Sequence, residues 1–233
     1  MKINSFLPVL LATTSITLVA QAIPAQAFEL GFTRKTNNSS FNVAPQLTTS
    51  VDDLGSGQVK FTFNNSGSVS AGTITEVDFG KTNFLNLLSL SSLSTTAAHN
   101  LDQGVNFTQT NTATLPATFG WNPAITFKAT NSGYQKTGVD VGESLSIIFN
   151  LKSGTSFSDI ETGFKNGTLA IATHVQSIGG TGGVSDKFES TYNTNNTKSV
   201  PEPGTILGLM AFGMGGLLTR KKSKNANSEK VTL

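Results

Sequence analysis

Apolar and polar residues alternate in several short segments of the chain, as they do in half-buried β-strands. The alternation is clearest in Gln58–Phe63 and Glu143–Leu151, where every second residue is apolar. Weaker versions predict three more strands: Val69–Phe79, Ala124–Thr130 and Thr168–Ile178. Gly and Asn residues, which suit tight turns, stand between several of these segments.

One segment has the period of a helix instead. Phe157, Ile160 and Phe164 recur at spacings of three and four residues. Ser158–Glu161 fits a capping box, in which a hydroxyl and a carboxylate bind free backbone N–H groups. Asn166-Gly167 suits the left-handed end of a helix. We therefore predict a helix of about two turns between two strands.

Many short strands with little helix are typical of an all-β fold. We expect an antiparallel β-sandwich of jelly-roll type with one short helix. Segment Phe84–Leu93 stays open between a helical face and a loop. The alternation is lost over 181–200, which ends in Asn, Thr and Lys residues. The pattern thus predicts a folded domain at 28–190 and a flexible linker at 191–199.

The amino terminus has the pattern of a secretory signal peptide. Met1-Lys2 gives a positive start, and the mostly apolar segment 6–20 has no acidic residue. Small residues at Ala25 and Ala27 match both recognition positions of a signal peptidase. We predict that residues 1–27 are removed and that Phe28 becomes the first residue of the exported chain.

The carboxyl terminus combines three features in order. A short motif comes first, made of Val200, Pro201, Glu202 and Pro203. An apolar run, Gly204–Thr219, follows, and three cations end it: Arg220, Lys221 and Lys222. Cations resist transfer through a bilayer and stay in the cytoplasm. The order predicts a transmembrane helix within 200–222, a cytoplasmic tail at 223–233 and a folded domain outside the inner membrane.

These three features together resemble the PEP-CTERM sorting signal of Gram-negative bacteria. The resemblance implies processing by an exosortase, a membrane-embedded cysteine peptidase. Three further segments look like recurring blocks of the exported domain in many PEP-CTERM proteins: Ile74–Gly80, Gly138–Leu145 and Leu169–Gly179. The resemblance implies an all-β exported module, held transiently in the membrane and then placed at the cell surface or outside the cell. It supplies no active site.

Charge and composition exclude several classes of function. The chain has a net charge of +2, but its positive charge is concentrated after Pro201, and residues 28–200 are net negative. The exported domain would therefore not attract nucleic acid. With no cysteine, it has neither thiol catalysis nor thiolate metal ligands. We expect no cofactor.

The remaining residues with chemical potential are few. His174 and His99 are the two histidines, and we interpret His174 as a structural strand residue rather than a base or metal ligand. Asp52-Asp53 with Asp78, or Asp140 with Glu143, offer carboxylate oxygens without the alternating ligands of a calcium loop. We therefore expect no metal site.

Trp121 and Tyr134 are scarce amphipathic aromatics that could stack on a sugar ring, although we interpret Trp121 as a core residue first. The sequence thus favours a non-enzymatic structural or adhesive protein of the cell surface or extracellular matrix. A carbohydrate-binding module of an exopolysaccharide matrix is the alternative. A secreted hydrolase is a third hypothesis. It lacks a Gly-x-Ser-x-Gly motif and would need a carboxylate pair, or a cluster around His174, in a cleft.

Overall fold

The computed structural model describes residues 26–94, 104–113, 115–180 and 182–194. Within these residues ten strands form one sheet: β1 (Ala27–Arg34), β2 (Leu47–Gly55), β3 (Gln58–Asn65), β4 (Thr73–Gly80), β5 (Leu88–Leu93), β6 (Phe107–Thr110), β7 (Pro123–Ala129), β8 (Ser144–Leu151), β9 (Ala170–Ile178) and β10 (Val184–Tyr192). Two α-helices, α1 (Phe84–Leu87) and α2 (Phe157–Lys165), and two 3₁₀ turns, η1 (Ala44–Gln46) and η2 (Ala117–Phe119), accompany them.

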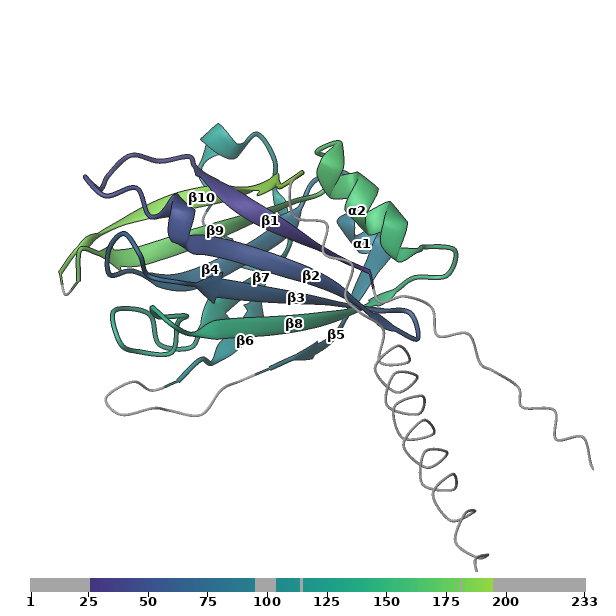
Figure 1. The fold of residues 1–233 in the computed structure, drawn as a ribbon, viewed down its shortest axis with the longest axis horizontal. Coiled ribbons are helices and arrows are strands. Elements are labelled where there is room, and N and C mark those ends of the chain that lie inside the picture. Colours follow the sequence, from purple (N-terminus) through teal and green to yellow (C-terminus); the bar gives the residue numbers. More distant parts are fainter. Residues whose placement is uncertain (1–25, 95–103, 114, 181, 195–233) are drawn as a thin grey trace, which may run out of the picture. The chain divides into compact units, whose positions relative to one another are not determined.

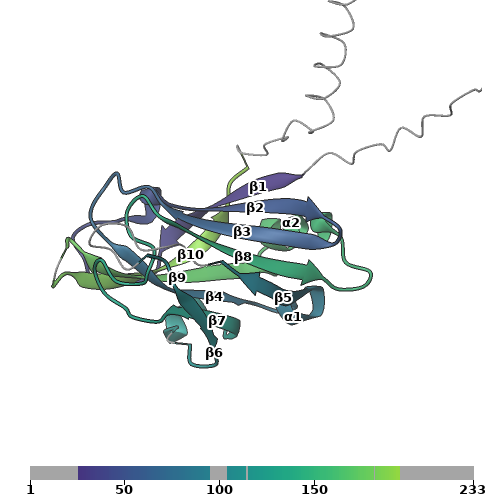
Figure 2. The same ribbon diagram turned by 90° about the horizontal axis from the view of Figure 1, so that it is seen from below.

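The strands follow the order β5-β8-β3-β2-β1-β10-β9-β4-β7-β6, with every neighbouring pair antiparallel. The predicted all-β class and antiparallel pairing are confirmed. The expected sandwich of separate sheets is corrected, because β1 pairs with both β2 and β10 and so joins the two halves into one sheet. That sheet curls until it nearly closes into a barrel, as Figures 1 and 2 show.

The predicted strands are observed as β3, β4, β7, β8 and β9. Four of them lie within two residues of the predicted bounds, whereas β4 begins at Thr73, four residues after the predicted start at Val69. The open segment Phe84–Leu93 forms both a short helix and a strand, α1 followed by β5. Four strands were not predicted: β1, β2, β6 and β10. Of these, β10 occupies much of the segment where alternation was lost. It runs to Tyr192, so the first two residues of the predicted linker belong to the sheet.

Phenylalanine rings fill the interior between the two sides of the curled sheet. The ring centroid of Phe79 on β4 lies 5.2 Å from that of Phe61 on β3 and 5.1 Å from that of Phe149 on β8. All three side chains are buried. Edge-to-face pairs of this kind add to the stability gained by burying the rings. The core therefore links strands that are distant in the sheet order.

Helix α2 lies across one end of the barrel (Figure 1). Its predicted apolar face is confirmed, since Phe157, Ile160 and Phe164 are all buried. The cap, however, lies two residues before the predicted one. Ser156 is the N-cap residue, and its side chain accepts from the backbone N–H of Asp159 at 3.3 Å.

None of the helices in the described part of the chain is long and apolar enough to cross a membrane. The predicted transmembrane run, Gly204–Thr219, lies outside the described residues, as do the motif at 200–203 and the cations at 220–222. Ala25 and His99 also fall outside them.

Candidate functional site

Ionisable side chains cross the outer face of the sheet in one row. On β4, Val77 and Phe79 point into the core, so Glu76 and Asp78 point to the opposite face. Glu76 lies opposite Lys128 of β7 on one side and His174 of β9 on the other. His174 in turn lies opposite Lys187 of β10. We call these four residues, Lys128, Glu76, His174 and Lys187, the outer-face row.

The outer-face row is held together by ion pairs around Glu76. One carboxylate oxygen of Glu76 lies 3.1 Å from the ammonium of Lys128, and the other lies 3.7 Å from that of Lys187. Glu76 is only 3% exposed, so both pairs are weakly screened by water. A groove of about 310 Å³ opens beside them, with Ser132 and Gln176 also in its lining.

Burial shifts the pKa values of two groups in opposite directions. Asp78 is 0% exposed, and its Oδ1 accepts from the hydroxyl of Thr126 at 2.6 Å. Burial, reinforced by the negative charge of Glu76, raises the pKa of Asp78 to about 7. Burial, reinforced by the positive charge of Lys187, lowers the pKa of His174 to about 4. Near neutral pH, His174 is therefore uncharged, and Asp78 retains its proton to a higher pH than an ordinary aspartate.

The outer-face row brings one carboxyl group, Glu76, next to His174, and Asp78 lies two residues farther along β4. The hydrolase hypothesis needs such a carboxylate pair, or a cluster around His174, in a cleft. The two carboxyl groups are poorly accessible to a ligand. Asp78 has no exposed surface through which it could meet a substrate. Both oxygens of Glu76 are occupied by lysines. Glu76 is thus engaged in ion pairs within the protein, whereas His174 is partly exposed and lines the groove.

A second pocket lies where β4 ends and has a volume of about 410 Å³. Its lining comes from the turn after β4 and from the segment between β6 and β7: Lys81, Thr82, Phe119, Gly120, Trp121 and Asn122. We call it the Trp121 pocket. The backbone N–H of Thr82 donates to the carbonyl of Thr168 at 3.2 Å, which fixes one wall to the turn after α2.

Three contacts fix the indole of Trp121. Its Nε1–H donates to a carboxylate oxygen of Glu189 on β10 at 2.8 Å. The ring of Phe119 meets it edge-on, with centroids 6.0 Å apart. On the strand side, a Cβ added to Gly80 would come within 2.6 Å of the indole, so this close approach needs glycine. The ring is therefore held rigidly while remaining partly exposed.

Glu189 connects the indole to two lysines. Its carboxylate lies 2.8 Å from the ammonium of Lys35 and 3.5 Å from that of Lys81. Burial opposes ionisation of Glu189, but the hydrogen bonds from Lys35 and Trp121 outweigh this effect and lower its pKa. Lys35 also lies 5.6 Å from the ring centroid of Phe119. One carboxylate thus orients the aromatic ring and both cations.

The other residues singled out from the sequence do not line this pocket. Tyr134 follows β7, whereas Trp121 precedes it, so Tyr134 lies at the opposite end of that strand. Asp52 pairs with Lys60 at 3.2 Å. Glu143 accepts from the backbone N–H of Asp140 at 2.8 Å. Among the residues that the structure describes, no group of three or more His, Cys, Asp or Glu side chains could hold a metal ion.

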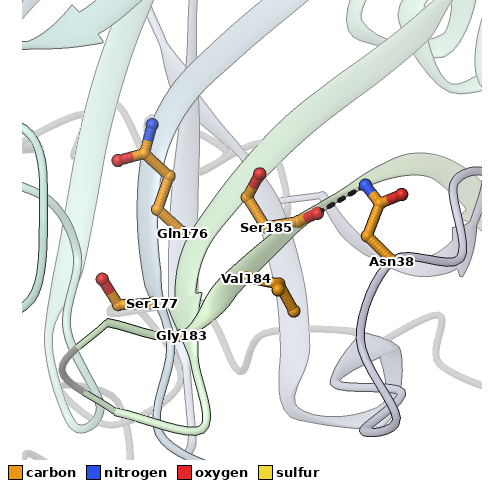
Figure 3. A pocket seen from close by; sticks show the side chains of 6 residues that line it. All are labelled: Asn38, Gln176, Ser177, Gly183, Val184 and Ser185. Carbon is orange, nitrogen blue, oxygen red and sulfur yellow. Dashed lines mark hydrogen bonds between the residues drawn. The ribbon is translucent and has the colours of Figure 1, made fainter.

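A third hollow, of about 450 Å³, lies at the β9–β10 hairpin (Figure 3). Its lining combines Asn38 with residues of the hairpin, and the Asn38 amide donates to the carbonyl of Ser185 at 2.8 Å. None of the described residues that line it has an ionisable or aromatic side chain. It therefore offers a ligand fewer directional contacts than the Trp121 pocket.

The predicted cleavage position coincides with the start of the sheet. Ala27 is the first residue of β1, and Phe28 is buried against Phe157 and Phe164 of α2, with ring centroids 5.6 and 5.9 Å apart. A chain that begins at Phe28 therefore keeps its first core residue.

Sequence reasoning missed most of the charged residues of both sites. Lys81, Lys128, Lys187 and Glu189 each look like ordinary surface residues when read alone. One signal was present in Thr73–Gly80, where polar residues alternate with the apolar residues of an interior strand. The identity of their partners on β7, β9 and β10 depends on sheet register, which the sequence pattern did not provide.

Comparison with known proteins identifies the carboxyl terminus. Residues 199–222 match the PEP-CTERM protein-sorting motif, which confirms the resemblance seen in the sequence. The comparisons with curated proteins and with solved structures each found no match to this chain. The chain therefore carries a PEP-CTERM sorting motif, which implies an exported protein that an exosortase sorts to the cell surface.

Proposed function

We propose that the β-domain acts without catalysis, as a structural or adhesive module displayed at the cell surface or in the extracellular matrix. An exosortase would cut the precursor near Val200–Pro203 and release the domain from its membrane anchor. The sorting motif at 199–222 supports this life history. The domain contributes a tightly packed sheet and a pocket with a fixed aromatic ring.

Mass spectrometry of the surface-exposed protein tests the processing. We expect a chain that begins at Phe28 and ends near Val200–Pro203. A Glu202→Ala variant should accumulate as a membrane-bound precursor, whereas Glu229→Ala, which changes the other acidic residue of the carboxyl-terminal segment, should be processed normally. A surface form that still carries residues 204–233 would contradict the proposal.

The Trp121 pocket favours one form of adhesion, the binding of carbohydrate. A sugar ring has an apolar face that packs on an aromatic ring and hydroxyl groups that need hydrogen-bond partners. The pocket offers a rigid indole together with the polar side chains of Lys81, Thr82 and Asn122. Fixing the ring before binding lowers the entropy that the ligand contact must overcome. This combination is the observation that carries the proposal.

Binding to the producer's own exopolysaccharide tests this second step. We expect saturable binding that Trp121→Ala weakens by roughly tenfold or more, the effect of removing a central aromatic contact. Tyr134→Ala is the matched control, because it removes the other candidate ring at the far end of β7. Equal binding by the wild type and Trp121→Ala would rule out the Trp121 pocket. A complete lack of binding would leave a purely structural role.

A further inference from the structure

We propose that the Trp121 pocket selects an acidic polysaccharide, with Lys81 contacting a carboxylate or sulfate group of the sugar chain. This inference rests on the proposed carbohydrate binding and adds the ligand's charge. Among the described residues that line the pocket, Lys81 alone carries a charge. A sugar stacked on Trp121 would place its substituents within the same pocket as this ammonium.

The backbone of Lys81 supports a role for its side chain. Its φ is +77°, in the left-handed region that glycine adopts without strain and that most other residues avoid. A glycine here would fit the turn after β4 at lower cost. Residues held in such uncommon conformations cluster at functional sites. The conformation of Lys81 is therefore consistent with a role for its side chain in the pocket, besides its ion pair with Glu189.

The ion pairs around Glu189 leave Lys81 with capacity for a ligand. Lys35 holds Glu189 closely, at 2.8 Å, and the indole N–H of Trp121 occupies the same carboxylate. Lys81 is farther away, at 3.5 Å, and its side chain is 29% exposed. Two lysines share one carboxylate, so the cluster has a net positive charge at neutral pH. An anionic group would find a positively charged partner that is accessible from the pocket.

The ammonium makes the pocket selective for charge. Phe119 and Trp121 form an aromatic wall beside it, with their rings edge-on to each other. A charge-assisted hydrogen bond from Lys81 to an anionic group is stronger than one to a neutral hydroxyl. The neutral hydroxyls of an uncharged sugar would gain less from the same ammonium. The pocket should therefore distinguish acidic from neutral chains with the same backbone.

A pair of polymers that differ only in charge tests the inference. The full chain, purified in detergent, is titrated with polygalacturonate and with its methyl-esterified, uncharged form. We expect wild type to bind polygalacturonate roughly tenfold more tightly, as a charged hydrogen bond allows. Lys81→Gly should remove that preference, so that the variant binds the two polymers with similar affinity. Its melting temperature should not fall, because glycine relieves the strained turn.

Ser56→Gly is the matched control, since Ser56 also has a left-handed φ of +52° but lies in the β2–β3 hairpin. It should relieve strain in the same way and keep the preference for the acidic polymer. A preference that persists in Lys81→Gly would overturn the role of Lys81 and leave carbohydrate binding intact. Binding of both polymers that is unaffected by Trp121→Ala would instead overturn the proposed site itself.

Discussion

Asp78 and His174 lie on adjacent strands, and burial acts on them in opposite ways. For Asp78, whose pKa rises from 3.8 to about 7, the stabilising contribution is complete below pH 3.8 and is lost as the pH rises through 7. For His174, whose pKa falls from 6.5 to about 4, the contribution is complete above pH 6.5 and is lost as the pH falls through 4. Glu76 and Lys187 influence both groups. Between pH 4 and 6.5 the two effects oppose each other.

In the wild type, the opposing pH dependences of the free energy of unfolding cancel between pH 4 and 6.5. A single substitution should therefore reveal the pH dependence of the group that remains. Relative to the wild type, Asp78→Asn should make the free energy of unfolding rise with pH, by about 1.4 kcal/mol per pH unit between pH 4.5 and 6. His174→Gln should change the slope by a similar amount in the opposite direction. Urea unfolding at a series of pH values measures both.

The double variant provides the control for this pair. Asp78→Asn combined with His174→Gln removes both titrating groups, so its slope should return to that of the wild type. If the two single variants had the same pH dependence as the wild type, neither group would be titrating as the structure requires.

At the scale of elements, α2 shows how a local motif fixes a boundary. Ser156 and Asp159 cap each other: the carboxylate of Asp159 accepts from the backbone N–H of Ser156 at 2.8 Å and from its hydroxyl at 2.6 Å. The predicted box, Ser158 with Glu161, has the same residue spacing. Glu161 instead accepts a hydrogen bond from the hydroxyl of Tyr192 at 2.6 Å and pairs with Lys165 at 2.9 Å. Its carboxylate joins α2 to the end of β10.

The observed N-cap, Ser156, and the N-cap predicted from the sequence, Ser158, lead to different mutational effects. Ser156→Ala should lower the free energy of unfolding by about 1 kcal/mol, the usual effect of losing an N-cap side chain. Ser158→Ala should change it by less than about 0.5 kcal/mol, because Ser158 is an exposed residue within the helix. Thermal or chemical denaturation of both variants compares them directly. A larger effect at Ser158 would favour the cap predicted from the sequence.

Across the whole molecule, stability depends on contacts between the two sides of the curled sheet. Besides Phe61 and Phe149, Phe79 meets Phe63, Phe84 and Phe127, with ring centroids 5.8, 5.1 and 6.1 Å apart. These rings come from β3, β4, β7, β8 and α1. Loss of the central ring would leave a cavity bordered by all of them.

Phe79→Ala should therefore destabilise the domain by about 3–5 kcal/mol. That amount is a large fraction of the total stability of an ordinary domain. Chemical denaturation should show an earlier transition, monitored by the fluorescence of Trp121. Phe41→Ala is the control, because Phe41 is 47% exposed and its loss should have little effect. Similar midpoints for the two variants would contradict the central place of Phe79.

Sequence reasoning worked best where one face of an element meets the core and the other meets water. The strands β3 and β8 were visible because their buried residues alternate with polar ones. In β10, however, adjacent residues Asp186, Lys187 and Phe188 are all buried. The negative charge of Asp186 is balanced by the guanidinium of Arg34, 2.5 Å from its carboxylate, which also accepts a hydrogen bond from the hydroxyl of Thr36 at 2.8 Å. Such partners are about 150 positions away, so the local pattern gave no sign that β10 lies inside the sheet.

The surroundings of the candidate site residues could not be predicted from the sequence for the same reason. Trp121 stood out because it is the one tryptophan of the chain. Its partly exposed position, however, depends on Gly80 of β4 and Glu189 of β10, which are distant from it in the sequence. Asp78 stood out as a carboxylate, but its burial depends on the packing of the outer face. These properties arise only when the strands pair in their observed register.

The sequence by itself determined the all-β class, the position of α2 and the sorting motif, because periodicity and terminal signals are properties of neighbouring residues. Tertiary structure alone decided that the sheet is continuous, that Asp78 is buried beside Glu76, and that Lys81 and Trp121 share a pocket. The physical reason is that strand pairing connects residues far apart in the chain. Burial, charge and pocket shape follow from those pairings.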